Sequence, residues 1–332
     1  MVNAHCHLEL SYLKGKIAER CGFAGFADGI AAARDGASPE ERFHAAAFRD
    51  AKMYSEGVAA VGDVCNGTST FAMKQQSKIY YHNFIELFGL RATDYSPIAE
   101  VMQGAAAAGL EYSPTPHSTY SLADAPFREA AAAAAGAPLS VHFMESRAEA
   151  ELFKGYGPLH ERNVREGLSI DFARYGSPAE RIIGSIPKGT KILLIHNAFA
   201  TEEDVQRITS HFGNENVTWV LCPRSNEYIE EAAPPVAMLR RLGANIAVGT
   251  DSLASNDSLS VIEELKVLQA LDETVPLEEL FGWVTEGGAR ALGIGSWAGS
   301  FEAGKRPGAA LITGIDWDAM RLTPAAESRH IL

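Results

Sequence analysis

The sequence predicts an α/β protein, a closed (β/α)8 TIM barrel with a small and incomplete β appendage at its C-terminal end. Eight short apolar or β-branched segments alternate with longer helix-forming stretches, which is typical of parallel βαβ units. Eight such strands within roughly 250 residues match a closed barrel in size. An open doubly wound sheet, as in a dehydrogenase, is the structural alternative. It is disfavoured because no glycine fingerprint of the GxGxxG type follows any of the segments.

The eight expected strands are recognised by their apolar or β-branched composition. Because helix-forming stretches separate them, we expect them to run parallel and to close into one sheet. In chain order they are Val2–Cys6, Val58–Val64, Ile79–Leu87, Leu110–Pro114, Leu139–Phe143, Ile192–Ile195, Val217–Leu221 and Asn245–Gly249.

Capping residues mark the starts of several expected helices. Ser38, followed by a proline and two glutamates, predicts a helix that runs to Ser55 and stops at Gly57. Asp124 begins an alanine-rich helix that ends at Gly136, and Thr201 with three following acids begins another. The remaining expected helices are Pro235–Leu242, Ser258–Leu271 and Leu277–Leu292.

The end of the chain differs from the alternating part. Residues 301–308 are rich in turn formers, and Ala309–Thr313 and His330–Leu332 are expected to be short strands. The sequence therefore predicts a hydrolase barrel over residues 1–298 and a small β appendage over residues 299–332.

Composition and charge exclude several classes of partner. The 332 residues carry a net charge of −13 without a cluster of Lys or Arg, which argues against nucleic acid and anionic membranes. No apolar run reaches the ~18 residues that a membrane span needs, and the first residues do not resemble a secretory signal. The four cysteines are scattered and expected to be free thiols. We therefore expect a cytoplasmic protein that acts on a small molecule.

Five of the ten histidines lie at the carboxyl ends of expected strands, where catalytic residues of barrels collect. They are His5, His7, His117, His142 and His196. His5 and His7 alternate along one strand, so both imidazoles can reach one point while Cys6 faces away. Each histidine by itself has an ordinary explanation, such as a chance pair or a core residue bonded to backbone.

Two carboxylates strengthen the histidine pattern. Asp251 ends an apolar strand, where an unpaired charge would be costly and a metal ion would provide a partner. Together with His5, His7 and His142 it predicts one divalent metal ion, zinc first and iron as the alternative. Glu145 follows His142 by three residues and would place a proton carrier beside the metal, although a helix-initiating acid is the simpler reading.

Six ordered motifs resemble the amidohydrolase superfamily, in the branch of cytosine deaminases, chlorohydrolases and S-adenosylhomocysteine deaminases. The first is also similar to the opening motif of aminodeoxyfutalosine deaminases. In chain order the motifs are Asn3–Glu9, Thr115–Ser121, Val141–Ser146, Ile195–Asn197, Cys222–Asn226 and Gly249–Ser252 with Ser255–Asn256.

The resemblance implies an aminohydrolase that attacks an amino-bearing ring carbon of a purine, pyrimidine or nucleoside-like substrate with water activated by the metal. Glu145 would move protons, His196 and Asp251 would orient the water, and His117 would contact the substrate. The ends of the third and seventh strands add Glu86 and Arg224 as candidate pocket residues. A homodimer is common among such relatives.

Two features differ from the superfamily pattern. No lysine ends the fourth expected strand, where members with two metals usually carry a carboxylated lysine, so a single metal is implied. The chain also starts at the first barrel strand, whereas relatives carry a preceding stretch that completes a small β-sandwich with the tail.

Three further functions remain as alternatives at this point. A hydrolase of the same fold could release chloride or open a cyclic amide, because the same activated water serves all of these reactions. A non-catalytic barrel would be expected to have lost at least one of the polar site residues, and none is lost. An open-sheet dehydrogenase would need the missing glycine fingerprint.

Overall fold

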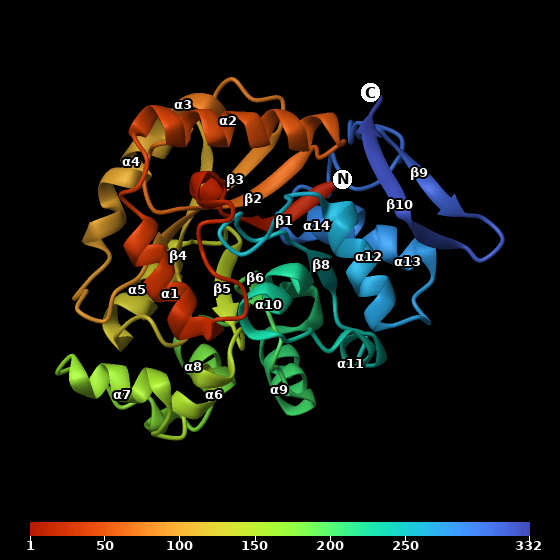
Figure 1. Ribbon diagram of the computed structural model, residues 1–332. Helices are drawn as coiled ribbons and strands as arrows, with labels where there is room; N and C mark the ends of the chain where they lie inside the picture. The colour runs from red at the N-terminus through yellow and green to blue at the C-terminus, as the bar shows by residue number, and fades with distance from the viewer.

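The computed structural model describes residues 1–332 and has a barrel of eight parallel strands at its centre (Figure 1). Hydrogen bonds join the strands in chain order as two four-stranded halves, β1 to β4 and β5 to β8. The predicted (β/α)8 fold is confirmed. The strands are β1 (Val2–Cys6), β2 (Ala60–Cys65), β3 (Tyr80–Leu87), β4 (Glu111–Pro116), β5 (Leu139–Phe143), β6 (Ile192–His196), β7 (Val217–Leu221) and β8 (Ile246–Val248).

The two halves of the barrel meet at its carboxyl end. Isolated parallel bridges join Cys6 to Asp251 and Ser118 to His142. The backbone N–H of Thr250 donates to the carbonyl of His5 at 2.9 Å, and that of His142 donates to the carbonyl of His117 at 2.8 Å. The two halves therefore meet, between β8 and β1 and between β4 and β5, at residues that the sequence analysis predicts to be functional.

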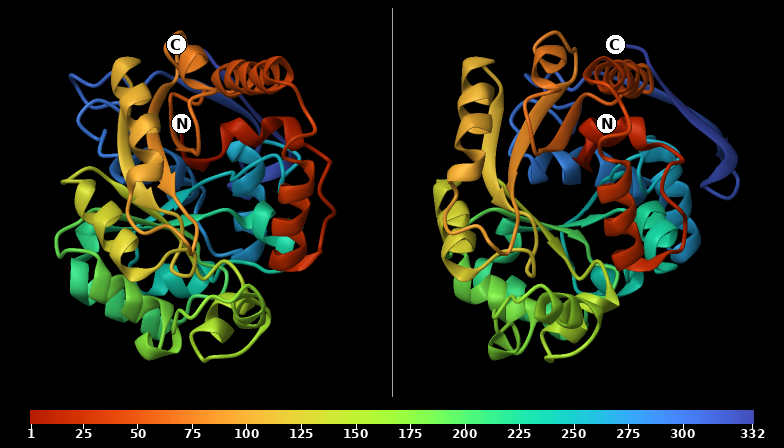
Figure 2. Two further views of the ribbon diagram at one scale, coloured as in Figure 1. Left: turned by 90° about the vertical axis from the view of Figure 1, so that its left-hand side faces the viewer. Right: turned by 60° about the vertical axis from the view of Figure 1, so that its left-hand side comes forward.

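Helices surround the strands, as the two views of Figure 2 show. Short 3₁₀ segments are η1 (Leu8–Leu13), η2 (Ser96–Ile98), η3 (Ala173–Tyr175) and η4 (Asn214–Asn216), and η5 (Trp283–Gly287) is a π-helical segment. The α-helices are α1 (Gly22–Ala33), α2 (Pro39–Ser55), α3 (Phe71–Lys74), α4 (Ala99–Ala107), α5 (Asp124–Ala133), α6 (Arg147–Leu152), α7 (Pro158–Arg165), α8 (Pro178–Ser185), α9 (Glu202–Phe212), α10 (Pro223–Glu230), α11 (Val236–Arg241), α12 (Val261–Leu271), α13 (Leu277–Gly282) and α14 (Gly288–Ala291).

The predicted helix starts are largely confirmed by their capping geometry. Ser38 and Thr201 each accept a hydrogen bond from the third helical N–H and form a complete capping box. The helix expected from Leu277 to Leu292 is instead divided into α13, η5 and α14. Gly287 lies in this divided region, where an added Cβ would lie 2.3 Å from the carbonyl oxygen of Ile246, so backbone of the segment touches β8 directly.

The core has two layers. The larger one fills the space between the strands and the outer helices and includes the fully buried Trp219 and Phe143. The smaller one lies inside the barrel, where Phe84, Ile195 and Val220 pack with residues of α14. The barrel interior is thus packed by apolar side chains below the polar carboxyl end.

The tail forms an antiparallel hairpin of β9 (Ala310–Asp316) and β10 (Arg321–His330), which packs against α12 and α2 at one side of the barrel (Figure 1). The second strand was expected at His330–Leu332, and that placement is wrong. The bounds of β10 were not predicted from the sequence because this strand consists mainly of polar and small residues and contains no apolar run. The division of the chain at residues 298 and 299 remains a prediction. No helix is long and apolar enough to cross a membrane.

Candidate metal centre and catalytic pocket

An irregularity in β1 directs His5 and His7 to the barrel axis. The pairing of β1 with β2 shifts register between Asn3 and Cys6, as in a β-bulge, which re-aims the side chains that follow it. Cys6 consequently packs in the outer core, whereas the His5 and His7 rings lie with centroids 4.9 Å apart. The prediction that Cys6 faces away from the two imidazoles agrees with this geometry.

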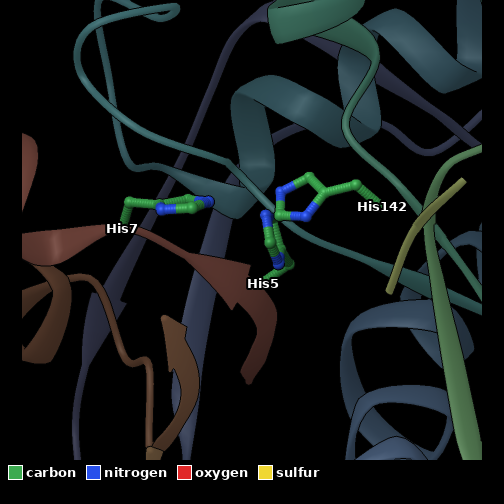
Figure 3. A group of neighbouring side chains, drawn as sticks. All are labelled: His5, His7 and His142. Atoms are coloured by element: carbon green, nitrogen blue, oxygen red, sulfur yellow. The ribbon is translucent and has the colours of Figure 1, made fainter. Parts of the chain in front are cut away.

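His142 and Asp251 meet this pair from β5 and from the end of β8. The His5 and His142 rings have centroids 5.0 Å apart, and Figure 3 shows the three imidazoles converging. Asp251 Oδ1 lies 3.4 Å from Nε2 of His7 and 3.7 Å from Nε2 of His5. The four residues predicted to bind metal therefore come together at one point.

The chemistry of these four residues fits a divalent metal ion. Both ring nitrogens of His5 are buried without a hydrogen-bond partner, a costly state that a bound ion would relieve. The ligand atoms of His5, His7 and His142 all lie within 4.8 Å of one another. Burial lowers the pKa of His7 and His142, so both rings are neutral and offer a lone pair.

The hydrogen bond at the other ring nitrogen of His142 fixes its tautomer. Nδ1 lies 2.8 Å from the carbonyl oxygen of His117, so it carries the hydrogen and Nε2 carries the lone pair. His117 also stacks on the His142 ring at 4.6 Å, and Glu86 Oε1 lies 3.6 Å from Nδ1. Glu86, His117 and His142 form another cluster of possible ligands. However, Nδ1 of His142, the ring nitrogen that faces Glu86, already donates its hydrogen to the carbonyl oxygen of His117.

Two serines hold the carboxylate of Asp251. Ser225 and Ser255 each donate a hydroxyl hydrogen to Oδ2 at 2.6 Å, which leaves Oδ1 to face the histidines. Burial alone would raise the pKa of Asp251, but His5 and His7 outweigh it and hold the pKa well below its usual range. Asp251 is therefore a carboxylate despite its burial.

Tight packing at the end of β8 sets the position of His5. An added Cβ on Gly249 would lie 2.7 Å from the Cβ of His5 and 2.8 Å from its carbonyl oxygen, so only glycine fits there. Asp251 and His196 have positive φ angles of 56° and 75°, a region that non-glycine residues rarely adopt. Such backbone strain is common at functional sites.

Glu145 lies beside the four ligand candidates. Its side chain is 8% exposed, and its Oε2 lies 3.6 Å from Nε2 of His196. The Tyr120 hydroxyl donates a hydrogen bond to Oε1. Burial raises the pKa of Glu145 well above its usual range, so this carboxyl group can hold a proton near neutral pH.

His196 differs from His142 in its tautomer. The Asn226 side-chain amide donates to Nδ1 of His196 at 3.2 Å, which places the ring hydrogen on Nε2. Burial lowers the pKa of His196 to about 3, so the ring is neutral. His196 consequently points an N–H group, rather than a lone pair, toward Glu145 and the ligand cluster.

A cavity of about 590 Å³ opens above these residues. Its floor contains the candidate residues His7, Glu86, His117, His142, Glu145, His196 and Asp251. Its outer wall is largely apolar and comes from α1, from the loop after β3 and from the segment of α6 and α7; it includes Phe23, Phe26, Ile30, Phe88, Leu152, Leu159 and Leu168. Arg34, Arg91, Arg162 and Glu166 also line it.

Arg224, predicted as a pocket residue, does not line this cavity. Its guanidinium instead approaches the carboxylates of Asp257 and Glu263, and its backbone N–H donates to Glu264 at 3.1 Å. The ion pair draws the Arg224 side chain toward α12.

Several residues at the site were not selected from the sequence. Tyr120, Ser225, Asn226 and Ser255 lie within the motifs that drew attention, where the hydroxyl and amide groups next to the ligands were the available signal. Helix α1 also escaped notice, although it is apolar and has no buried residue, which is typical of a helix that lines a cavity.

Known proteins resemble this chain in sequence and structure. An adenosine deaminase of Helicobacter pylori is 31% identical over 172 residues, which is 51% of this chain but only 41% of that protein. A 5-methylthioadenosine/S-adenosylhomocysteine deaminase of Halobacterium salinarum is 27% identical over 98% of this chain and 74% of its own. The crystal structure of Helicobacter pylori aminofutalosine deaminase in complex with methylthio-coformycin aligns with a TM-score of 0.79 and 26% identity, covering 92% of this chain and 76% of that one.

A closed parallel barrel with buried imidazoles and a carboxylate at its carboxyl end is the architecture of a barrel metalloprotein. The profile of the Amidohydrolase family matches residues 1–326, so nearly the whole chain is covered. The chain belongs to the Amidohydrolase family, and the resemblance inferred from its six motifs is confirmed.

Proposed function

We propose that this protein is a metal-dependent deaminase of purine nucleosides, which replaces a ring amino group by oxygen from water and releases ammonia. The observation that carries the proposal is the position of Glu145, buried in the floor of the cavity beside the ligand cluster with Oε2 3.6 Å from Nε2 of His196. A binding protein would have no need for a buried acid of raised pKa at that place. The deaminases among its relatives support the same reaction.

The metal would be held by His5, His7, His142 and Asp251, which supply three nitrogen donors and one oxygen donor. This set suits zinc, and we propose one zinc ion per chain. A divalent metal lowers the pKa of water from 15.7 to about 7, so a nucleophile is available at neutral pH.

The remaining polar residues of the floor would guide water and protons. Asp251 would accept a hydrogen bond from the attacking water and the Nε2–H of His196 would donate one, so the two groups would orient the water. Glu145 would take one proton from the attacking water and give it to the ring nitrogen. It would then take the second proton, from the hydroxyl on the attacked carbon, and give it to the departing amine, so that a carbonyl forms as ammonia leaves.

The cavity supports a substrate larger than a free base. Glu86 and His117 lie at the edge of the floor, where they can contact the ring or a sugar hydroxyl. The apolar outer wall has room for a group on the sugar, and Arg34 and Arg162 at its margin can meet a negative charge. Methylthioadenosine, S-adenosylhomocysteine and aminodeoxyfutalosine, named for its relatives, are therefore proposed as substrate candidates.

The experiment is a screen of the zinc-loaded protein for ammonia release. Adenosine and the three larger nucleosides are assayed together with cytosine as a base without a sugar. We expect one ammonia per substrate converted and a higher kcat/KM for at least one of the larger nucleosides than for cytosine. Zinc-loaded protein that releases no ammonia from any aminopurine nucleoside would contradict the proposal, and release of chloride from a chlorinated ring would favour the hydrolase alternative.

We also propose that the protein works in the reducing cytoplasm. Cys6, Cys21, Cys65 and Cys222 are all unpaired, and only Cys21 is not buried. Such cysteine usage is typical of reducing compartments.

A further inference from the structure

Tyr120 contacts the residue proposed to carry protons. Its ring is 6% exposed, it lines the cavity, and its hydroxyl donates to Oε1 of Glu145. The other carboxylate oxygen, Oε2, has His196 Nε2 at 3.6 Å, which is beyond hydrogen-bond distance. The two oxygens of Glu145 therefore have different surroundings.

We infer that Tyr120 is a positioning residue that fixes the Glu145 carboxyl group and leaves Oε2 as the atom that takes and gives the proton. The inference rests on the proposed deaminase function. A hydroxyl donor at Oε1 makes this oxygen a permanent acceptor, so the transferable proton belongs on Oε2. Burial raises the pKa of Tyr120 well above its usual range, so the phenol remains a donor at any working pH.

The main chain of Glu145 is held from the same loop. Glu149 Oε2 accepts from the backbone N–H of Glu145 at 3.2 Å, and Glu149 Oε1 accepts from the hydroxyl of Thr119. Thr119 and Tyr120 are neighbours after β4, so one loop fixes both the backbone and the side chain of Glu145. Glu149 is fully buried, and this arrangement accounts for a second acid so close to the first.

Fixing the carboxyl group matters most for the departure of the amine. An amine leaves as ammonia only after it receives a proton, whereas chloride leaves a ring carbon without one. Loss of the Tyr120 hydroxyl should therefore slow an amino substrate more than its chloro analogue. A merely structural role of Tyr120 would slow both by the same factor.

The test compares Tyr120→Phe with Tyr81→Phe as a matched control. Tyr81 is also buried, at 4% exposure, and its hydroxyl donates to a carboxylate, Asp50, at 2.7 Å, but it lies outside the cavity. Both variants lose one buried phenol hydroxyl and should lose similar stability. Crystal structures of both variants and kinetics on adenosine and 6-chloropurine ribonucleoside are measured on the zinc-loaded protein.

We expect the carboxyl group of Glu145 to leave its position in Tyr120→Phe and to keep it in Tyr81→Phe. We expect kcat for adenosine to fall roughly 30-fold in Tyr120→Phe with KM within about twofold, and the chloro substrate to lose less than about threefold. An unmoved Glu145 carboxyl group, or equal losses on the two substrates, would overturn the inference. If wild-type protein releases neither ammonia nor chloride, the proposed function fails, while the crystal structures still decide whether Tyr120 holds Glu145.

Discussion

At the residue scale, the neighbours of His142 and His196 give two similar imidazoles different tasks. The carbonyl of His117 accepts the Nδ1 hydrogen of His142, whereas the amide of Asn226 donates to Nδ1 of His196. The first ring consequently offers a lone pair at Nε2 and the second offers an N–H group. This difference explains why one histidine suits a metal ligand and the other suits a donor to water.

Replacing Glu145 by Gln should abolish ammonia release and leave metal binding intact. The amide has the size of the carboxyl group but cannot transfer a proton, so kcat should fall by roughly 10² to 10⁴. Glu145 is not among the four proposed ligands, so metal content should stay at the wild-type value. Kinetics and elemental analysis of the same preparation check both statements. Near-normal turnover in the variant would refute the proton path through Glu145.

His82 should give the protein an acid-sensitive stability that is independent of the site. It is buried on β3 with Nε2 2.9 Å from the hydroxyl of Ser113, and burial lowers its pKa from 6.5 to about 4. In the unfolded chain, His82 therefore becomes protonated below about pH 6.5, whereas in the folded chain it stays neutral down to about pH 4. Stability is fully present above pH 6.5 and falls as the pH drops through this window.

The variant His82→Gln should remove that dependence. Between pH 8 and pH 5 its free energy of unfolding should fall by about 2 kcal/mol less than that of the wild type. Denaturant unfolding at the two pH values measures this difference, with exposed His44→Gln as the control that keeps the wild-type dependence. If the free energy of unfolding of His82→Gln fell as much as that of the wild type between these two pH values, the pH dependence would not come from His82.

At the element scale, the sequence predicted the features that depend on nearby residues, namely the strands and the helix starts. Eight strands were found within about two residues of their bounds because most are apolar or β-branched segments between helix-forming stretches, and the capping boxes at Ser38 and Thr201 marked two helices. The β1 irregularity and β10 escaped prediction. A bulge depends on the register of the partner strand, and β10 has no apolar run because one of its faces is exposed.

The candidate site shows the same division. The metal-ligand candidates were predictable because a histidine or aspartate is uncommon at the end of an apolar strand. They are His5, His7, His142 and Asp251, at or just after the carboxyl ends of β1, β5 and β8. The Tyr120–Glu145 contact joins residues 25 positions apart, and the Asn226–His196 contact joins residues 30 apart, so neither follows from spacing along the chain. Arg224 does not line the cavity, because it pairs with Asp257 in the loop before α12 and with Glu263 on α12.

The close contact of Gly249 with His5 predicts that Gly249→Ala weakens the metal centre. The added methyl group would press on the Cβ and the carbonyl oxygen of His5, and the backbone of β1 must move to admit it. We expect the variant to hold clearly less metal than the wild type and to lose roughly 1–3 kcal/mol of stability. Gly184→Ala in α8, where an added Cβ meets nothing within 4 Å, is the control and should keep full metal content. Full metal content in Gly249→Ala would show that β1 can adapt.

At the scale of the whole molecule, the metal centre lies where the barrel closes. The two four-stranded halves meet only through isolated bridges, and Asp251 and His142 belong to these bridges. A metal ion bound by His5, His7, His142 and Asp251 would connect β1 with β5 and β8 across both halves. Metal binding and closure of the barrel should therefore be energetically coupled.

This coupling predicts that metal removal destabilises the entire barrel rather than one loop. A ligand that binds only the folded state stabilises it by about 4 kcal/mol at a thousandfold excess over its Kd. Dialysis against a chelator should therefore lower the Tm by several degrees in one cooperative transition, and added zinc should restore it. The double variant His5→Ala, His7→Ala removes two proposed ligands, so its Tm should respond neither to chelator nor to zinc. Calorimetry of both proteins with and without zinc provides the measurement. A wild-type Tm that responds to neither zinc nor chelator would mean that these four side chains do not form a metal centre, because an ion that links β1 to β5 and β8 would stabilise the closed barrel.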